Sequence, residues 1–93
     1  HIHEAPQTIQ VSTDTLDSFC KTHAVEFIDF LKIDTEGAEV AILQGALNLL
    51  QNQRVQYIQF EYGGTYFDAR TTLQEAYHIL TSCNYDVYRI VPD

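Results

Sequence analysis

Two acidic side chains mark the place where an apolar segment of the sequence gives way to a polar turn. Asp34 and Glu36 follow the apolar run Phe30–Ile33, and an amphipathic stretch begins just after them. A carboxylate that ends a strand can orient a substrate hydroxyl, act as a general base or help to hold a divalent cation. Alternatively, Asp34 and Glu36 only complement the dipole of a helix that begins near Gly37. The bare spacing favours neither interpretation.

A third carboxylate, Glu61, stands near the end of a second strand-like segment, Val55–Tyr62. In open α/β sheets the functional site lies just beyond the carboxyl ends of the strands, so we expect Glu61 to lie beside Asp34. Two neighbouring carboxylates repel each other unless a cation, a proton or a substrate group lies between them. The pair is therefore more informative than either residue alone. Lys32 could neutralise one carboxylate, although an ammonium group that simply reaches water explains this residue better.

The loop after Glu61 offers weaker candidates for ligand binding. Gly63 and Gly64 could present backbone amides to a ligand, but a hinge explains the glycine pair at least as well. Tyr66 and Phe67 could form a lid, or they could close the edge of the core. We identify no nucleophile triad, no closely spaced cysteine pair and no phosphate-binding glycine motif, and we assign no metal ligand.

A strand that passes through the acidic turn into a helix must position these residues. Apolar residues recur at steps of three and four after the turn, which predicts a single helix with one buried face. The residues of that face are Val40, Leu43, Leu47 and Leu50. Gly45 falls inside this helix, where glycine costs about 1 kcal/mol relative to alanine. Close packing of the helix against the sheet would explain the glycine.

The rest of the chain supplies further elements of the same kind. Apolar alternation predicts strands at Thr8–Ser12 and Asp86–Val91, and capping residues predict a helix at Leu16–His23. A capping box at Thr72 opens a third helix. Its inward residues are expected to be Leu73, Ala76, Tyr77 and Leu80. The order β-α-β-α-β-α-β predicts an α/β fold, with a mostly parallel sheet of about four strands and three helices.

Length and charge restrict the possible partners. The chain has 93 residues, with 5 Lys and Arg against 13 Asp and Glu, and a formal net charge of −8. Such an acidic chain repels the phosphates of nucleic acids and of anionic membranes, and no apolar run reaches the roughly 20 residues that cross a bilayer. We therefore expect a cytoplasmic protein without nucleic-acid or membrane partners. Residues 8–93 are expected to form one domain, after a disordered terminus at residues 1–7.

The sulfur-containing residues add two expectations. Cys20 and Cys83 fall in predicted helices without close spacing, so we expect buried, reduced thiols in preference to a disulfide. The chain contains no methionine, and we therefore expect it to be part of a longer product or a processed one.

Four segments of the chain together resemble the FkbM family of S-adenosylmethionine-dependent methyltransferases. These segments are TLDSF (Thr15–Phe19), IDFLKIDTEGAEVAILQGA (Ile28–Ala46), IQFEYG (Ile58–Gly63) and YDVYRIV (Tyr85–Val91). Their order and spacing resemble the C-terminal half of that domain, over nearly the whole chain after Gln7. The KIDTEGAE core is a specific signature of the family.

The resemblance implies a Rossmann-like methyltransferase sheet, with S-adenosylmethionine as cofactor and a small-molecule hydroxyl as methyl acceptor. It implies that Asp34 lies next to both cofactor and acceptor, and that Glu61 lies at the strand end beyond. We take Asp34 and Glu61 as the catalytic residues, and Asp34 also as the cofactor-binding residue. The substrate-binding residues assigned with them are Lys32, Glu36, Gly63 and Tyr66.

The chain departs from the family because it contains no glycine-rich turn of the GxGxG type. We therefore expect the acceptor-side half of an O-methyltransferase that is inactive by itself. The alternative is a non-catalytic module that binds a small ligand or a protein. Without the family's first strand, the strand through Lys32 would be an open apolar edge. We expect Ile9–Val11 or a second copy of the chain to fill this edge, and a homodimer is the favoured outcome.

Overall fold

The computed structural model describes residues 13–34, 37–61 and 66–91 of the chain. Its elements are α1 (Leu16–Thr22), β1 (Ile28–Ile33), α2 (Glu39–Gln44), α3 (Leu47–Gln51), β2 (Val55–Phe60) and α4 (Tyr66–Ser82). Within the described residues the sheet has two strands, so the protein is a mixture of helices and a small parallel sheet. The larger sheet stays a prediction. Its expected strand Thr8–Ser12 and the expected terminus at residues 1–7 lie outside the described ranges.

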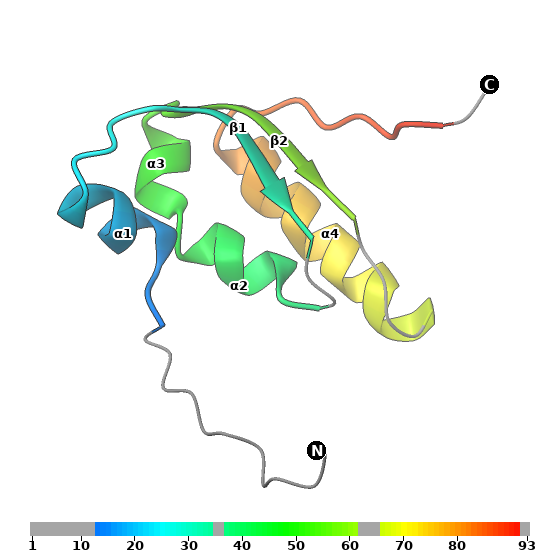
Figure 1. Ribbon diagram of the computed structural model, residues 1–93. Coiled ribbons are helices and arrows are strands. Elements are labelled where there is room, and N and C mark those ends of the chain that lie inside the picture. The colour runs from blue at the N-terminus through cyan, green and yellow to red at the C-terminus, as the bar shows by residue number, and fades with distance from the viewer. Residues whose placement is uncertain (1–12, 35–36, 62–65, 92–93) are drawn as a thin grey trace, which may run out of the picture.

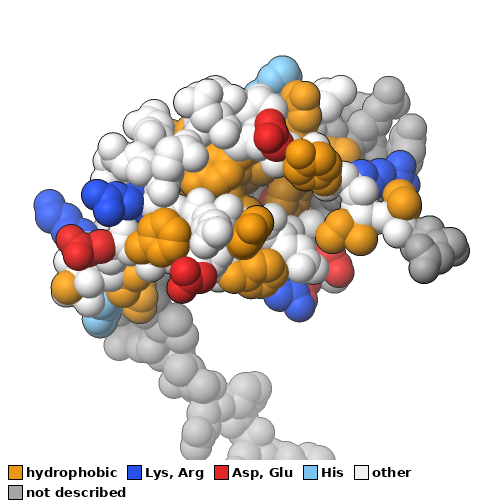
Figure 2. Space-filling model, turned by 90° about the horizontal axis from the view of Figure 1, so that it is seen from above, with side chains coloured by type: hydrophobic (Ala, Val, Ile, Leu, Met, Phe, Trp, Pro, Cys, Tyr) orange, Lys and Arg blue, Asp and Glu red, His pale blue; other side chains and the backbone are white. Residues whose placement is uncertain are grey.

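The two strands of the sheet lie side by side and run parallel. Ile28 is the register partner of Val55 at one end, and Ile33 is the partner of Phe60 at the other. Helices α2 and α3 form the connection between the strands, and Figure 1 shows these two helices and α4 on the same side of the sheet. In the described chain, no helix covers the opposite face. Seen from above, that face shows a group of hydrophobic side chains (Figure 2).

One apolar cluster joins the sheet to the helices. Its buried members are Cys20, Ile33, Leu43, Ala46, Leu49, Leu50, Val55, Ala76, Leu80 and Cys83. Both cysteines are free thiols, as expected from the sequence. In α4 the expectation is confirmed for Ala76 and Leu80, but it is wrong for Tyr77, whose side chain is 50 % exposed. The buried stripe of α4 includes the half-buried Ile79 instead, which turns Tyr77 toward solvent.

The segment expected to be one helix forms two, α2 and α3, which are separated at Gly45 and Ala46. Asp17 of α1 stabilises this break. Its backbone N–H donates to the Gly45 carbonyl at 2.9 Å, and its carboxylate accepts the backbone N–H groups of Asn48 and Leu49 at 2.9 and 3.0 Å. The Asp17 side chain thus caps the N-terminus of α3, a role that usually belongs to the residue directly before a helix.

Gly45 packs against the start of α1, and the expected contact with the sheet is wrong. A Cβ atom at Gly45 would lie only 3.1 Å from the Thr15 Cβ atom. Thr15 is the N-cap of α1, and its hydroxyl accepts the Ser18 backbone N–H at 3.1 Å. The glycine therefore lets the α2–α3 junction approach the capped end of α1.

The C-terminal segment expected to be a strand, Asp86–Val91, has no strand pairing. The Tyr85 hydroxyl donates to the Val55 carbonyl at 2.6 Å and fixes the start of the segment beside β2. Figure 1 shows the chain leaving the sheet beyond that point, and Tyr88 and Ile90 are each 83 % exposed. Alternating apolar residues form a strand only where a neighbour accepts their backbone hydrogen bonds.

Candidate functional site

The strand register brings the two principal candidate residues to the same edge of the sheet. Asp34 directly follows Ile33 and Glu61 directly follows Phe60, and Ile33 and Phe60 are register partners. Both acidic side chains are exposed. The expected adjacency of the two strands is thus confirmed, and both carboxylates lie where parallel strands end. Their catalytic roles remain a prediction.

The other candidate residues are only partly described. Lys32 is an exposed residue of β1 and has Gln59 of β2 as its register partner. Tyr66 is the first residue of α4, and its side chain is not among those described. Glu36 and Gly63 lie outside the described residues. The structure therefore groups Lys32 with Asp34 and Glu61 at one end of the sheet and leaves the other assignments as predictions.

Glu39 is a functional candidate that the sequence identified only as part of a longer matching segment. It is the first residue of α2, and its side chain is 1 % exposed. One carboxylate oxygen, Oε2, accepts the Gly37 backbone N–H at 3.2 Å. Gly37 has a φ of 101°, a conformation that glycine adopts without steric cost. Glu39 thus holds the backbone of Gly37, three residues after Asp34, through this hydrogen bond.

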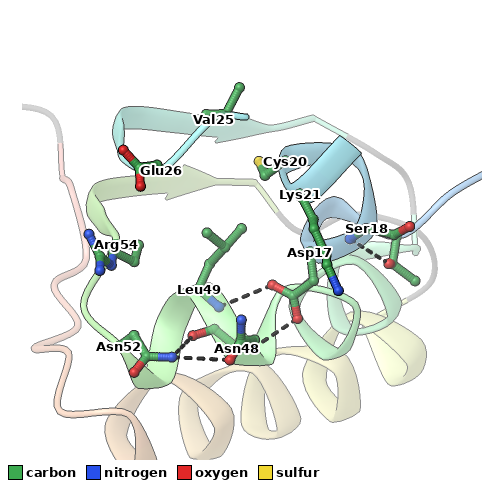
Figure 3. A pocket seen from close by; sticks show the side chains of 11 residues that line it. Asp17, Ser18, Cys20, Lys21, Val25, Glu26, Asn48, Leu49, Asn52 and Arg54 are labelled. Carbon is green, nitrogen blue, oxygen red and sulfur yellow. Dashed lines mark hydrogen bonds between the residues drawn. The ribbon is translucent and has the colours of Figure 1, made fainter. Parts of the chain in front are cut away.

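Two hollows of the described surface lie away from these carboxylates. One, of about 680 Å³, lies between α1, α3 and the segments that lead into β1 and β2 (Figure 3). Its lining consists of Thr15, Asp17, Ser18, Cys20, Lys21, Val25, Glu26, Asn48, Leu49, Asn52 and Arg54. Because both strands begin here, this amino-edge hollow is at the end of the sheet opposite to Asp34 and Glu61.

Basic and acidic residues both line the amino-edge hollow, but their side chains do not point toward a common centre. In Figure 3 the Lys21 and Arg54 side chains lie at opposite sides of it, with Asn48 and Leu49 between them. The Asp17 carboxylate is already engaged by two backbone N–H groups of α3. A second hollow, of about 790 Å³, lies between α1 and α2. Neither hollow includes a residue that the sequence assigns to catalysis or to substrate binding.

Exposed carboxylates such as Asp34 and Glu61 belong to a residue type that can act on a hydroxyl group. An exposed carboxylate accepts a hydrogen bond from a substrate O–H, and it takes the proton when the oxygen attacks an electrophile. A second carboxylate on the next strand can hold a neighbouring hydroxyl of the same molecule. Among the described residues, no group of three or more His, Cys, Asp and Glu side chains could hold a metal ion. In the same ranges, no helix has the length and apolar character needed to cross a membrane.

Two parallel strands joined through helices, with acidic residues where the strands end, are compatible with an α/β fold. The family comparison is more specific, because residues 2–87 match the methyltransferase FkbM domain. This chain belongs to that family. The match confirms the resemblance seen in the sequence, and it extends over most of the chain. Comparison with curated proteins and with solved structures gave no match.

Membership of this family implies that S-adenosylmethionine is the methyl donor. The described residues provide only part of the site that such a donor needs. A donor of this kind needs a cradle for its adenosyl group, which in dinucleotide-type folds is a glycine-rich turn between a strand and a helix. The described strand-to-helix turn contains a single glycine, Gly37, and its N–H is taken by Glu39. The described strand-to-helix turn therefore does not provide such a cradle for the adenosyl group.

Proposed function

We propose that this chain is the acceptor-binding half of an FkbM-type O-methyltransferase that methylates a hydroxyl group of a small molecule. Family membership supports methyl transfer. The single observation that supports the acceptor role is the parallel register, in which Asp34 and Glu61 follow the paired residues Ile33 and Phe60. In this proposal the chain corresponds to the C-terminal half of the domain. Other residues of the native polypeptide, or a partner, supply the adenosyl-binding half.

In this proposal both carboxylates act on the acceptor, and Asp34 also lies next to the cofactor. Asp34 accepts the hydrogen bond of the reacting hydroxyl and takes its proton as the oxygen acquires the methyl group. Glu61 accepts a second hydroxyl and fixes the orientation of the acceptor. Lys32, Glu36, Gly63 and Tyr66 complete the acceptor site. The cofactor supplies the electrophilic methyl group when bound, and Glu39 keeps the turn after Asp34 in place.

The first test is titration calorimetry of the chain with S-adenosylmethionine. We expect no binding heat, because no glycine-rich turn is present to hold the adenosyl group. Binding in the micromolar range would contradict the proposal that the chain is inactive by itself. The chain would then hold the donor through residues other than a glycine-rich turn.

The second test is methyl transfer by the assembled enzyme, in which the chain is joined to an FkbM adenosyl-binding half. Labelled methyl transfer to sugars and other polyhydroxylated compounds measures the activity. We expect Asp34→Asn to lower kcat by about 10²- to 10⁴-fold, the usual contribution of a general base, and Glu61→Gln to raise KM. Asp86→Asn, a change of an exposed residue outside the helices and strands, is the matched control. If Asp34→Asn and Asp86→Asn are equally active, the assigned base is wrong.

A second candidate function is a non-catalytic module that binds a small ligand or a protein. The absence of a glycine-rich turn favours it, because such a module needs no methyl donor. The assembled enzyme separates the two candidates. Transfer that depends on Asp34 supports the methyltransferase, whereas an assembled and folded protein without transfer to any acceptor supports the binding module.

A further inference from the structure

Glu39 is a charged side chain that the fold buries. It is 1 % exposed, and among the described residues it is the one buried side chain that carries a charge. An ionisable side chain is rarely buried unless hydrogen bonding compensates for its lost hydration. An apolar side chain of similar size would fill the same space without that compensation. The buried carboxylate therefore indicates a polar role inside the fold.

The hydrogen bond of Glu39 runs backward along the chain. Its Oε2 atom accepts the Gly37 backbone N–H at 3.2 Å, although Glu39 is itself the first residue of α2. Ala38 stands at the N-cap position and makes no side-chain cap hydrogen bond. A capping side chain ordinarily satisfies the free N–H groups at the start of a helix. Here the buried carboxylate instead holds the backbone just before the helix.

Gly37 is distinguished by its backbone conformation. Its φ is 101°, a value that residues with a side chain rarely adopt. A Cβ atom added at Gly37 would have no atom of the described residues within 4 Å, apart from its chain neighbours. Within these ranges the conformation, and not a lack of space, requires glycine. Gly37 thus permits the conformation of this turn, and Glu39 holds it.

We infer that Glu39 is a positioning residue, which holds the end of β1 in the orientation from which Asp34 acts on the acceptor, a role that rests on the function proposed above. Ile33, the last residue of β1, is 3 % exposed and pairs in register with Phe60. Asp34 follows it directly, and only two residues separate Asp34 from Gly37. The sheet and core thus hold the chain before Asp34, and Glu39 holds it after Asp34. Such support matters because a displacement of about 1 Å can lower a rate by about 10²-fold.

Hydrogen exchange of the Gly37 backbone amide in the 93-residue chain tests the contact itself. Nuclear magnetic resonance follows this amide in the wild type and in three variants. We expect about tenfold faster exchange in Glu39→Ala, because the acceptor is lost, and a rate near that of the wild type in Glu39→Gln, whose amide oxygen replaces Oε2. Glu75→Ala, at an exposed residue of α4, is the matched control. Equal Gly37 exchange in Glu39→Ala and Glu75→Ala would overturn the inference.

A double-mutant cycle in the assembled enzyme tests whether Glu39 acts through Asp34. We expect Glu39→Ala to lower kcat by about 10²-fold with little change in the acceptor KM, and Glu39→Gln to retain most of kcat. When Asp34→Asn is already present, Glu39→Ala should cause no further loss, since the group to be positioned is gone. When Glu61→Gln is present instead, the full loss should persist. A residue that only stabilises the fold would lower kcat equally in all three backgrounds, and that result would overturn the inference.

Gly37→Ala alters the same turn and leaves the buried carboxylate in place. The added methyl group has no described residue within 4 Å except its chain neighbours, but the positive φ is unfavourable for alanine. The N–H of residue 37 should therefore turn away from Glu39. We expect the same fall in kcat as in Glu39→Ala, with an unchanged circular dichroism spectrum. This variant keeps the test decisive if Glu39→Ala does not fold.

The Asp34→Asn variant separates a failure of this inference from a failure of the proposed function. If Asp34→Asn is as active as the wild type, both fail, because no base at position 34 needs to be held. If Asp34→Asn is inactive while Glu39→Ala and Gly37→Ala keep their kcat, the proposed function stands and the positioning role of Glu39 is wrong.

Discussion

At the scale of single residues, burial controls the acidity of the Cys20 thiol. The side chain is 3 % exposed, and this burial raises the pKa of the thiol above its ordinary value of 9.0. The nearby Asp17 carboxylate raises the same pKa further. The folded chain therefore holds the thiol proton more tightly than the unfolded chain does. Since a thiolate is the reactive form, Cys20 is an inert core residue at neutral pH.

The raised pKa of Cys20 predicts a loss of stability in alkaline solution. Below about pH 9 the thiol is protonated in both states, and its contribution to stability is fully present. As the pH rises through 9.0, the unfolded state loses this proton first and the free energy of unfolding falls. Urea denaturation at a series of pH values should show this decrease. The Cys20→Ala variant should start from a lower stability and show a shallower decrease.

An equally steep decrease in Cys20→Ala would mean that other groups control the alkaline transition. Tyr85 is one such group, because burial raises the pKa of its phenol above the ordinary 10.0. Its deprotonation would also remove the donor that bonds the Val55 carbonyl. A Tyr85→Phe variant distinguishes the two contributions, since it leaves the Cys20 thiol unchanged.

At the scale of elements, the Asp17 carboxylate couples α1 to α3. It accepts two backbone N–H groups that would otherwise be unsatisfied at the start of a short helix. Replacement of Asp17 by alanine should lower the free energy of unfolding by about 1–2 kcal/mol, as the loss of a good N-cap does. Asp17→Asn, which keeps one carbonyl acceptor, should cost less. Chemical denaturation measures both effects.

The control for Asp17 is Asp86→Ala, which removes the same charge from an exposed residue of the C-terminal segment. We expect its stability to stay within about 0.5 kcal/mol of the wild type. If Asp17→Ala is no less stable than Asp86→Ala, the two hydrogen bonds contribute nothing and the break between α2 and α3 has another cause.

The elements also show what sequence patterns can and cannot predict. The apolar runs at β1 and β2 are strong local signals, and both strands and their parallel pairing follow from them. The division of the central helix depends on Asp17, which lies 31 residues before Asn48, and no local pattern contains such a contact. The Asp86–Val91 segment has the alternation of a strand, but pairing depends on a neighbouring edge rather than on the segment.

The same distinction applies to the candidate site. The meeting of Asp34 and Glu61 at one edge follows from a general rule of parallel sheets, so it could be predicted from the sequence. The burial of Glu39 could not, because charged side chains are rarely buried and the pattern places this residue in an exposed first turn. Glu39 is identified as a candidate only by its 1 % exposure and its hydrogen bond to Gly37 in the structure.

At the scale of the whole molecule, the described helices lie on one side of the sheet, and this arrangement determines which apolar side chains are exposed to other molecules. The described helices cover one face of the sheet (Figure 1). In the ranges that the structure describes, the other face carries the exposed side chains of Phe30 and Tyr57, and β1 pairs with β2 alone.

The position of the amino-edge hollow has a practical consequence for ligand discovery. A compound lodged between α1 and α3 would touch Lys21 or Arg54, at the far end of the strands from the carboxylates. It would not overlap the acceptor site that we propose at Asp34 and Glu61. In the assembled enzyme, inhibition by such a compound would lower the maximal velocity and leave the apparent acceptor affinity unchanged, the kinetic signature of a remote regulator.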